Sequence, residues 1–372
     1  MKKIRLLHVI TRLPIGGAER LILGILNYLN RNQFESIICC IQDRGELAKE
    51  VESMGVPVIS LELMNRGGYD RRVVPALRLL MRSKNIDLVH THLYHANLYG
   101  RLATRKEKIP VISSVHNTYA KQKWHRNMIN RFLARYTFCI TAGSLDVEKD
   151  LIKIDHIAKN KIITISNSID LERIKSNLSP SKAKELLGID STDIVVGTVG
   201  RTEEQKGHKY LLDAISNLKN TTDISNFKLL LVGDGTLLPS LKLLAKELGI
   251  YDLCIFTGNI SELGDIYRAI DIFVMPSLWE GLSLSMLEAM AANIPMISTD
   301  VGGARDVLGD SKWGIIVNHG DPVEISTAIK KLIQNPNLRN KMAISGAKRV
   351  RSKYSIKIMT KRLETIYIDA IK

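Results

Sequence analysis

The 372-residue sequence lacks any run of the eighteen or so uncharged apolar residues that a membrane-spanning helix requires. The start of the chain mimics a signal peptide, but His8 and Arg12 interrupt its apolar stretch and no convincing small-residue cleavage site follows. Cysteine is scarce, and the four thiols have no metal-ligand or redox spacing, which indicates buried thiols of a reducing compartment: Cys39, Cys40, Cys139 and Cys254. We therefore expect a cytoplasmic protein, or one attached peripherally to the inner face of the plasma membrane.

Two sequence patterns of nucleotide and metal chemistry are also missing. The chain has no Asp-x-Asp pair, so no paired carboxylates are available to hold Mg²⁺ against a diphosphate. The Gly197-x-x-Gly200 spacing does not complete a dinucleotide-binding fingerprint. These absences favour a protein that neutralises phosphate charge with its own side chains and needs no metal or other cofactor.

Acidic residues are under-represented in the first half of the chain. Residues 1–180 contain 29 Lys and Arg against 16 Asp and Glu, whereas the remainder contains 24 against 22. The resulting positive field attracts lipid headgroups, nucleic acid or phosphorylated substrates. Few aromatic residues are interleaved with the basic ones and no nucleic-acid module is recognisable, so nucleic-acid binding is the weakest of these alternatives.

Apolar runs of strand length alternate with helix-like stretches, which is the rhythm of a parallel sheet with crossover helices. In the first half the expected strands are Ile4–Ile10, Ser36–Ile41, Pro57–Leu61, Asp87–His90, Pro110–Val115, Phe138–Thr141 and Ile162–Ser166. In the second half they are Ile194–Val199, Lys228–Val232, Cys254–Phe256, Ile272–Met275, Pro295–Ser298 and Gly314–Val317. The length suits two α/β domains, and we place the linker in the polar stretch Leu171–Ser191. A basic last helix is expected over Pro336–Lys372.

The segment from Asp271 to Leu308 is the most informative part of the chain. It reads as a buried strand, a loop with Glu280, a helix capped by Ser283 or Ser285, and a second strand. Because that helix is apolar nearly all round, its Glu288 is costly unless paired or used. Both acids are expected at the carboxyl end of a parallel sheet, where open α/β folds bind ligands. The free N–H groups at the helix start suit a phosphate.

Cations and glycines follow other expected strands at the same kind of edge. Arg201 and Lys206 come after Ile194–Val199 and can form a diphosphate clamp, although both also suit a solvated loop. Gly16 and Gly17 follow the first strand and let backbone N–H groups approach a ligand. Gly233 marks another strand-end turn.

The spacing Glu280-x7-Glu288, with Leu-Glu-Ala-Met and Asp300-Val-Gly-Gly, resembles the donor-site signature of retaining, nucleotide-sugar-dependent glycosyltransferases of family 4. The resemblance implies the GT-B fold, in which two Rossmann-like domains with parallel sheets face each other across a cleft. It implies an acceptor-side domain over residues 1–172, a nucleotide-sugar domain over 173–350, and a helix over 351–372 that crosses back to the first domain. Two departures from the family pattern are Ser166-Asn-Ser in place of Pro-Asn-Gly, and Gly281-Leu-Ser-Leu in place of a Gly-Phe-Gly type.

The resemblance also implies a role for each site residue. Arg201 and Lys206 would hold the donor diphosphate, with Gly16 and Gly17 facing it across the cleft. Glu280 would hold donor-sugar hydroxyls, and Glu288 the ribose. The remaining assignments are a nucleotide base near Gly233 and phosphate contacts from the amides of Leu282, Ser283 and Leu284.

Histidines gather in the run from His90 to His95 and at His116. His90 and His92 share one face of a strand, but no nearby carboxylate or thiolate completes a tetrahedral zinc site, so we expect no metal there. His116 follows the strand Pro110–Val115. A strand-end histidine is often only a polar anchor, but here it matches the family's cleft histidine, which contacts and orients the donor sugar.

The stretch Tyr119–Tyr136 places Trp124, Met128, Phe132 and other apolar residues along one helical stripe with basic residues around it. This pattern fits a helix lying on an anionic membrane and equally fits a helix whose apolar side packs on the core.

Together with the family resemblance, the sequence predicts a retaining, metal-independent glycosyltransferase. It would move a hexose or N-acetylhexosamine from a nucleoside-diphosphate sugar, with UDP favoured, to a lipid-linked saccharide for cell-surface polysaccharide. An epimerase or phosphorylase on the same fold is the alternative enzyme class.

Overall fold

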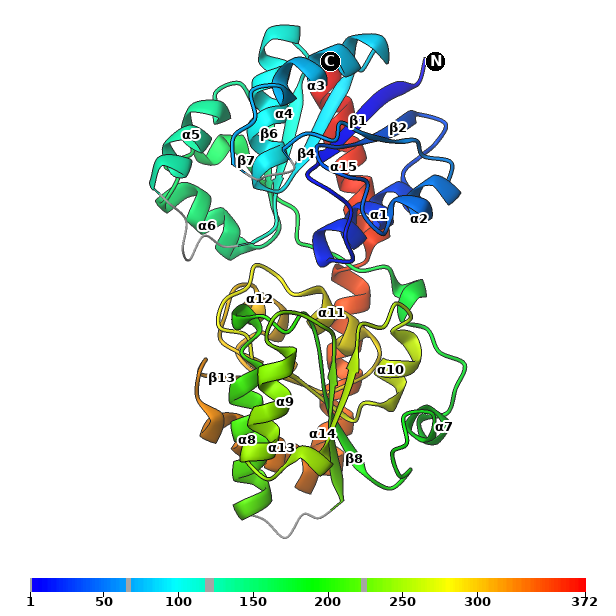
Figure 1. Cartoon of the computed structure of the whole chain (residues 1–372), viewed down its shortest axis with the longest axis vertical. Helices are drawn as coiled ribbons and strands as arrows, with labels where there is room; N and C mark the ends of the chain where they lie inside the picture. The colour runs from blue at the N-terminus through cyan, green and yellow to red at the C-terminus, as the bar shows by residue number, and fades with distance from the viewer. Residues whose placement is uncertain (1, 65–67, 118–123, 222–225) are drawn as a thin grey trace. The chain divides into compact units, whose positions relative to one another are not determined.

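The computed structural model describes residues 2–64, 68–117, 124–221 and 226–372 of the chain. Within these residues the chain forms two compact units, each built on its own parallel sheet (Figure 1). The first unit contains Met1–Ser168 and Ile356–Lys372, and the second contains Ile169–Ser355. These divisions lie a few residues from the expected ones at 172 and 350. The predicted α/β class with two parallel sheets is confirmed.

The sheet of the first unit has seven strands in the order β3-β2-β1-β4-β5-β6-β7. Each of the predicted strands of this half is present, with ends that differ by up to two residues. Their bounds are β1 (Ile4–Ile10), β2 (Phe34–Cys40), β3 (Val58–Ser60), β4 (Leu88–His92), β5 (Val111–Val115), β6 (Cys139–Ala142) and β7 (Ile162–Thr164). The central strands β1 and β4 pair in parallel, and their register places His8 opposite His90.

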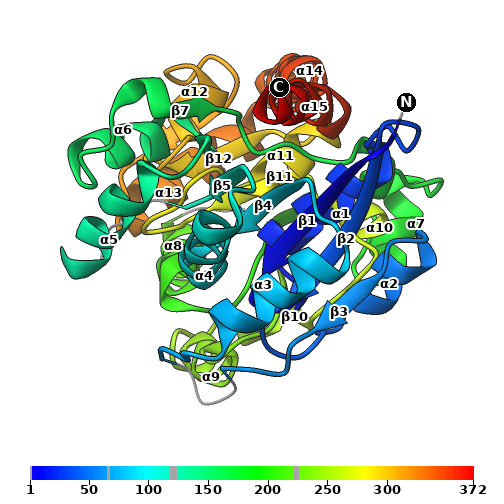
Figure 2. The ribbon, with the colours of Figure 1, turned by 90° about the horizontal axis from the view of Figure 1, so that it is seen from above.

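Helices cover both faces of this sheet, because successive side chains of each strand point to opposite sides. Leu7 and Val89 pack against α3 and α4, whereas Leu6 and Leu88 pack against α1 and α15. In Figure 2, α15 accordingly lies on the opposite side of β1 and β4 from α3. The elements of this unit are α1 (Gly17–Tyr28), α2 (Ala48–Ser53), α3 (Val73–Ser83), α4 (Tyr94–Glu107), α5 (Trp124–Ala134), α6 (Leu145–Lys153), η1 (Lys159–Lys161) and α15 (Ile356–Ile371).

The second unit carries six strands in the order β10-β9-β8-β11-β12-β13. Their bounds are β8 (Ile194–Val199), β9 (Phe227–Val232), β10 (Cys254–Gly258), β11 (Ile272–Met275), β12 (Met296–Thr299) and β13 (Ile315–Val317). The helical elements are η2 (Leu171–Ile174), α7 (Pro180–Glu185), η3 (Glu204–Lys206), α8 (His208–Thr221), α9 (Leu238–Glu247), η4 (Tyr251–Leu253), α10 (Gly264–Ala269), α11 (Leu284–Ala291), α12 (Ala304–Leu308), α13 (Pro322–Gln334) and α14 (Pro336–Lys353). All strands run parallel, so their carboxyl ends meet at one edge of the sheet.

Three expectations about chain organisation need correction. The expected linker Leu171–Ser191 is folded inside the second unit, where Ile174 and Ile189 join the apolar core. The expected last helix is two helices, because the backbone leaves helical geometry at Tyr354, whose carbonyl accepts the N–H of Ile169 at 2.9 Å. Three of the four free cysteines are buried as predicted, but Cys254 is only half-buried on the edge strand β10.

In the described part of the chain, no helix combines the length and apolar content needed to cross a bilayer.

Candidate active site

The acidic loop of the second unit connects β11 to α11 at the carboxyl edge of the sheet. Thr299, at the end of the neighbouring β12, donates its hydroxyl to the carbonyl of Ser277 at 2.6 Å. The same hydroxyl lies 3.2 Å from the carbonyl oxygen of Met275. Met275 ends β11, so a side chain of one strand fixes where the loop leaves the next strand. The loop that carries Glu280 is thereby held on rigid elements.

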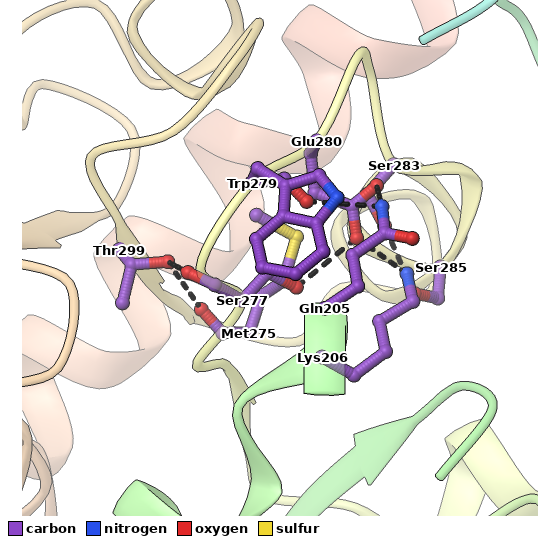
Figure 3. Close-up of polar contacts among 9 residues, drawn as sticks. All are labelled: Gln205, Lys206, Met275, Ser277, Trp279, Glu280, Ser283, Ser285 and Thr299. Atoms are coloured by element: carbon purple, nitrogen blue, oxygen red, sulfur yellow. Dashed lines mark hydrogen bonds and ion pairs between the residues drawn. The ribbon is translucent and has the colours of Figure 1, made fainter. Parts of the chain in front are cut away.

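Glu280 and Lys206 form a buried ion pair at this edge (Figure 3). The Lys206 Nζ lies 2.5 Å from Glu280 Oε1, and the exposed fractions of the two side chains are 18% and 9%. The hydroxyl of Ser277 donates to the same carboxylate oxygen at 3.0 Å. Gln205 donates to the carbonyl of Trp279 at 3.0 Å, and its amide nitrogen lies 3.4 Å from Glu280 Oε2. The carboxylate is therefore oriented from several sides before any ligand arrives.

A buried ion pair of this kind is weak support for stability, because the desolvation of both charges offsets their attraction. The pair joins two segments that are 74 residues apart in the chain, η3 and the loop after β11. It sets the position of one charge relative to the other to within a hydrogen-bond length. We interpret the pair as a device for positioning charge at the sheet edge.

Two glycines allow close backbone approaches at this sheet edge, one between η3 and the loop after β11 and one between the ends of β9 and β8. Gly207 has φ +62°, and a side chain there would bring its Cβ to 2.1 Å from the carbonyl oxygen of Pro276, directly after β11. Gly233, which follows β9, has φ +131°, and a Cβ there would lie 2.0 Å from the carbonyl oxygen of Gly200. Any other residue would push these strand ends apart. The predicted site residue Gly233 thus has a steric reason for being glycine that needs no ligand.

The structure brings Lys206 and Glu280 together but leaves Arg201 exposed on the loop after β8. Its charge acts on Glu203, whose carboxylate accepts the backbone N–H and the hydroxyl of Thr236. Those hydrogen bonds are the main cause of a lowered pKa at Glu203, and Arg201 adds to it. Arg201 therefore remains available to an anionic ligand without first giving up a buried partner.

Glu288 projects from α11 and is half-buried. Its Oε2 accepts a hydrogen bond of 2.7 Å from the hydroxyl of Tyr267 on α10. Burial raises the pKa of Tyr267 well above its ordinary value, and the neighbouring Glu288 carboxylate raises it further. The phenol consequently stays a donor at any physiological pH. The expectation that Glu288 needs a partner in an apolar helix is met by Tyr267, a residue that no sequence pattern singled out.

Ser283 occupies the N-cap position of α11, but its side chain does not cap the helix. Its hydroxyl instead lies 3.1 Å from the hydroxyl of Ser285. Leu282 and Ser283 are buried and Leu284 is half-buried as the helix begins. The helix start therefore keeps backbone N–H groups that no N-cap side chain satisfies, and such groups favour an anion.

In the first unit, the Gly16-Gly17 turn leads from β1 into α1, with Gly16 in extended geometry at the N-cap. Glu19, whose position no sequence pattern indicated, is 7% exposed and folds back over this turn. A Cβ on Gly16 would lie 2.4 Å from a carboxylate oxygen of Glu19. The positive end of this helix thus already faces a carboxylate, so a phosphate approaching it would meet a like charge.

His116 follows β5 and has a defined tautomer. Its Nδ1 lies 2.9 Å from the Asn167 Oδ1, and because an amide oxygen only accepts, Nδ1 carries the proton. Its ring stacks parallel to that of His92, with centroids 6.0 Å apart. Burial lowers the pKa of His116, against a smaller raising effect from Asn167. The imidazole is therefore neutral near pH 7 and offers Nε2 as an acceptor for a hydroxyl.

The sequence missed His8, which joins His90 and His92 in a buried cluster because β1 and β4 are adjacent. His8 Nδ1 lies 3.2 Å from His92 Nε2, while His90 contacts Tyr367 and Ser114, each at 2.7 Å. These contacts use four of the six ring nitrogens, and the other two, His8 Nε2 and His92 Nδ1, have no hydrogen-bond partner within the described part of the chain. Burial lowers the pKa of all three histidines, so they are neutral. We interpret the cluster as a hydrogen-bonded core anchored on α15.

Solved structures with the same architecture come from bacterial glycosyltransferases. A glycosyltransferase from Rickettsia africae superposes with a TM-score of 0.86 at 21% identity, over 100% of both chains. HepE from Anabaena, in complex with UDP-glucose, superposes with a TM-score of 0.87 at 18% identity, over 98% of this chain and 100% of that one. At these identities the likeness establishes the fold, which is GT-B, as the sequence predicted.

Sequence comparison identifies the family. The family model described as "Glycosyltransferase Family 4" matches residues 15–173, and the one described as "Glycosyl transferases group 1" matches residues 181–349. The chain is 25% identical to the UDP-Gal:alpha-D-GlcNAc-diphosphoundecaprenol alpha-1,3-galactosyltransferase of Escherichia coli, over 99% of this chain and 98% of that one. It is also 25% identical to the capsular polysaccharide biosynthesis glycosyltransferase CapM of Staphylococcus aureus, over 100% and 99%. The chain belongs to glycosyltransferase family 4, and the comparisons give no support to an epimerase.

Proposed function

We propose that this glycosyltransferase moves a hexose or N-acetylhexosamine from a UDP-sugar to a lipid-linked saccharide, with retention of anomeric configuration, during assembly of a cell-surface polysaccharide. The observation that carries the proposal is the buried contact between Lys206 and Glu280 at the carboxyl edge of the second sheet. It joins a cation suited to a diphosphate and a carboxylate suited to sugar hydroxyls, and the carboxylate belongs to the Glu-x7-Glu segment. The UDP donor and lipid-linked acceptor in the name of the Escherichia coli relative support the choice of substrates.

The proposed chemistry is positioning and charge stabilisation. Lys206 and Arg201 would neutralise the negative charge that develops on the departing diphosphate, and Glu280 would hold the donor sugar through its hydroxyls. Glu288, oriented by Tyr267, would bind the ribose, with Gly233 beside the base. The Nε2 atom of His116 would accept a hydrogen bond from a hydroxyl of the donor sugar. We assign no protein nucleophile, and the leaving phosphate would accept the proton of the acceptor hydroxyl on the same face.

A thermal-shift panel of nucleoside diphosphates and their sugars tests the donor assignment. A ligand at a hundred times its Kd stabilises the folded protein by about 2.7 kcal/mol, which raises the melting temperature measurably. We expect UDP and one or more UDP-sugars to raise it more than the corresponding ADP or GDP compounds. Release of UDP from the stabilising donor, dependent on an added acceptor, would then establish transfer. A chain stabilised by none of these compounds would contradict the proposal.

We further propose that the reaction needs no metal ion, because protein cations supply the charge that Mg²⁺ would otherwise provide. Transfer should therefore continue at an unchanged rate in excess EDTA. The control is the same assay with EDTA saturated by Mg²⁺, which separates chelation from any direct effect of the reagent. Loss of activity in EDTA, with recovery on addition of Mg²⁺ or Mn²⁺, would refute metal independence.

Helix α5 supports a membrane-bound acceptor. Residues 119–123 of the predicted amphipathic stretch lie outside the described residues, and the described helix ends at Ala134, before Tyr136. Its apolar stripe does not pack on the core as a whole. Leu133 is buried, but the exposed fractions of Trp124, Met128 and Phe132 are 72%, 62% and 44%.

Arginines accompany this exposed face. The Arg105 guanidinium lies 4.2 Å from the ring centroid of Tyr136 and 5.7 Å from that of Phe132. Exposed aromatic side chains with cations beside them suit the headgroup region of an anionic bilayer. We propose that this surface attaches the protein reversibly to the inner face of the plasma membrane.

Vesicle sedimentation tests this attachment. Binding should require anionic lipid and fall with added salt, because each Lys or Arg at such a surface contributes about 1 kcal/mol. The double variant Trp124→Ala, Phe132→Ala should bind more weakly. A double variant at exposed apolar residues of the second unit, Leu186→Ala with Leu243→Ala, is the matched control and should bind like the wild type. Equal binding to neutral vesicles, or none to acidic ones, would exclude this role for α5.

A further inference from the structure

A cavity of about 210 Å³ lies in the first unit, beside His116 and between helices α4 and α5. His116 is part of its wall, but none of the roles proposed above places a ligand in it. The polar residues that line it are Tyr94, Asn97, Arg101, His116, Arg126 and Asn130. Pockets that enclose drug-sized ligands measure about 300–1,000 Å³. The cavity is therefore large enough for a small group and part of what is attached to it.

The charge of the cavity is positive. Arg126 is half-buried, and its guanidinium lies over the ring of Tyr94, 4.2 Å from the ring centroid, which restricts its position. Arg101 is 3% exposed and is held in place by donating from Nε to the carbonyl of Asn97 at 2.7 Å and from Nη2 to Asn130 Oδ1 at 2.6 Å. Two guanidinium groups with restricted orientations thus face one small volume.

Among the described residues that line the cavity, none is acidic. The carboxylate of Asp155 is behind Asn130, whose side-chain amide donates to it. Asp155 is outside the lining, although its charge acts on Arg101, and no carboxylate among the described lining residues faces Arg126 across the cavity. A planar guanidinium pairs bidentately with phosphate oxygens, so phosphate is the anion that this arrangement fits best.

We propose that this cavity binds the diphosphate of the acceptor substrate, with Arg126 at its entrance and Arg101 in its wall. The inference rests on the proposed function and adds the group by which the acceptor is recognised. Ile129 of α5 lines the cavity and is 38% exposed, so the apolar surface of α5 begins at the cavity itself. A diphosphate bound there would place its lipid chain along Met128 and Phe132.

The test is calorimetric titration of the full-length protein with farnesyl diphosphate, inorganic pyrophosphate and farnesol, in the presence of saturating UDP to occupy the donor site. We expect farnesyl diphosphate to bind, and Arg126→Ala to weaken its binding about tenfold or more, as loss of a charge-assisted contact does. Arg126→Lys should restore part of the affinity. Arg131→Ala, at an exposed arginine of the same helix, is the matched control and should bind like the wild type.

The controls separate this site from the donor site. Affinity for farnesyl diphosphate that is equal in Arg126→Ala and the wild type, or reduced equally by Arg131→Ala, would overturn the proposal. Loss of farnesyl diphosphate binding in Lys206→Ala, with binding retained in Arg126→Ala, would also overturn the proposal. Pyrophosphate bound as tightly as farnesyl diphosphate would support the phosphate site and overturn the lipid contact. Failure of UDP to bind would count against the proposed function, while the titrations without UDP would still decide whether the cavity binds diphosphate.

Discussion

Lys206→Ala should lower kcat/KM for the nucleotide-sugar donor by about 10- to 150-fold, because a charge-assisted contact with the diphosphate is worth about 1.5–3 kcal/mol. The same substitution leaves the Glu280 carboxylate buried without its cation. Breaking a buried pair by removing one partner costs about 3–5 kcal/mol. Since the Lys206 side chain keeps an exposed fraction of 18%, we expect a loss of unfolding free energy at the lower end of that range. Steady-state kinetics and urea unfolding measure the two effects separately.

Arg201→Ala separates these two effects. Arg201 is exposed, so its removal should weaken donor binding without a measurable change in unfolding free energy. Lys209→Ala, at an exposed lysine of α8, controls for the loss of one positive charge and should leave both quantities unchanged. If Lys206→Ala and Arg201→Ala both retain wild-type kinetics with a saturable donor, the diphosphate is bound elsewhere.

The fold followed from the sequence because parallel strands buried on both faces read as continuous apolar runs. The run Ile4–Ile10 became β1 with the same bounds, and Ile272–Met275 became β11. The order of the strands in each sheet could not be predicted from the sequence, because strand pairing depends on contacts between distant segments. For that reason the sequence alone could not bring His8 to His90, and the return of the last helix to the first unit was expected only from the family resemblance.

Helix breaks and the direction in which a helix faces were harder to predict. The basic amphipathic pattern over Pro336–Lys372 is continuous, but the carbonyl of Tyr354 is used by Ile169, a residue 185 positions earlier. The stripe on α5 suits a core and a membrane equally in sequence, and only the burial of Asn130, Leu133 and Ala134 shows which side of the helix faces inward.

At the site, residue types and their place at the sheet edge could be predicted from the sequence, but the contacts between side chains could not. The sequence placed Lys206 and Glu280 at the same sheet edge, and the structure adds that they touch and that Ser277 donates to the same carboxylate. It could not identify Tyr267 as the partner of Glu288, because α10 carries no motif. Nor could it show that Glu19 faces the Gly16 turn, since this depends on a side-chain rotamer. The roles of all these residues in transfer remain predictions.

Substitutions of the two acids of the Glu-x7-Glu segment should affect different kinetic constants, one kcat and the other the donor KM. Glu280→Gln preserves shape but removes the charge that Lys206, Ser277 and Gln205 orient. If Glu280 holds hydroxyls of the reacting sugar, its contacts strengthen as the sugar becomes electron-deficient in the transition state. We therefore expect kcat to fall about a hundredfold, as with other charge-stabilising groups, and the donor KM to change much less.

Glu288→Gln should instead raise the donor KM about tenfold and leave kcat nearly unchanged, because a ribose contact is the same in the ground and transition states. Tyr267→Phe offers an independent check, since it removes only the 2.7 Å hydrogen bond that orients Glu288. It should raise KM in the same way by a smaller factor, and add little when combined with Glu288→Gln. Glu247→Gln, at an exposed acid of α9, is the control and should match the wild type. A kcat defect in Glu288→Gln with a KM defect in Glu280→Gln would reverse the assignment of the two acids.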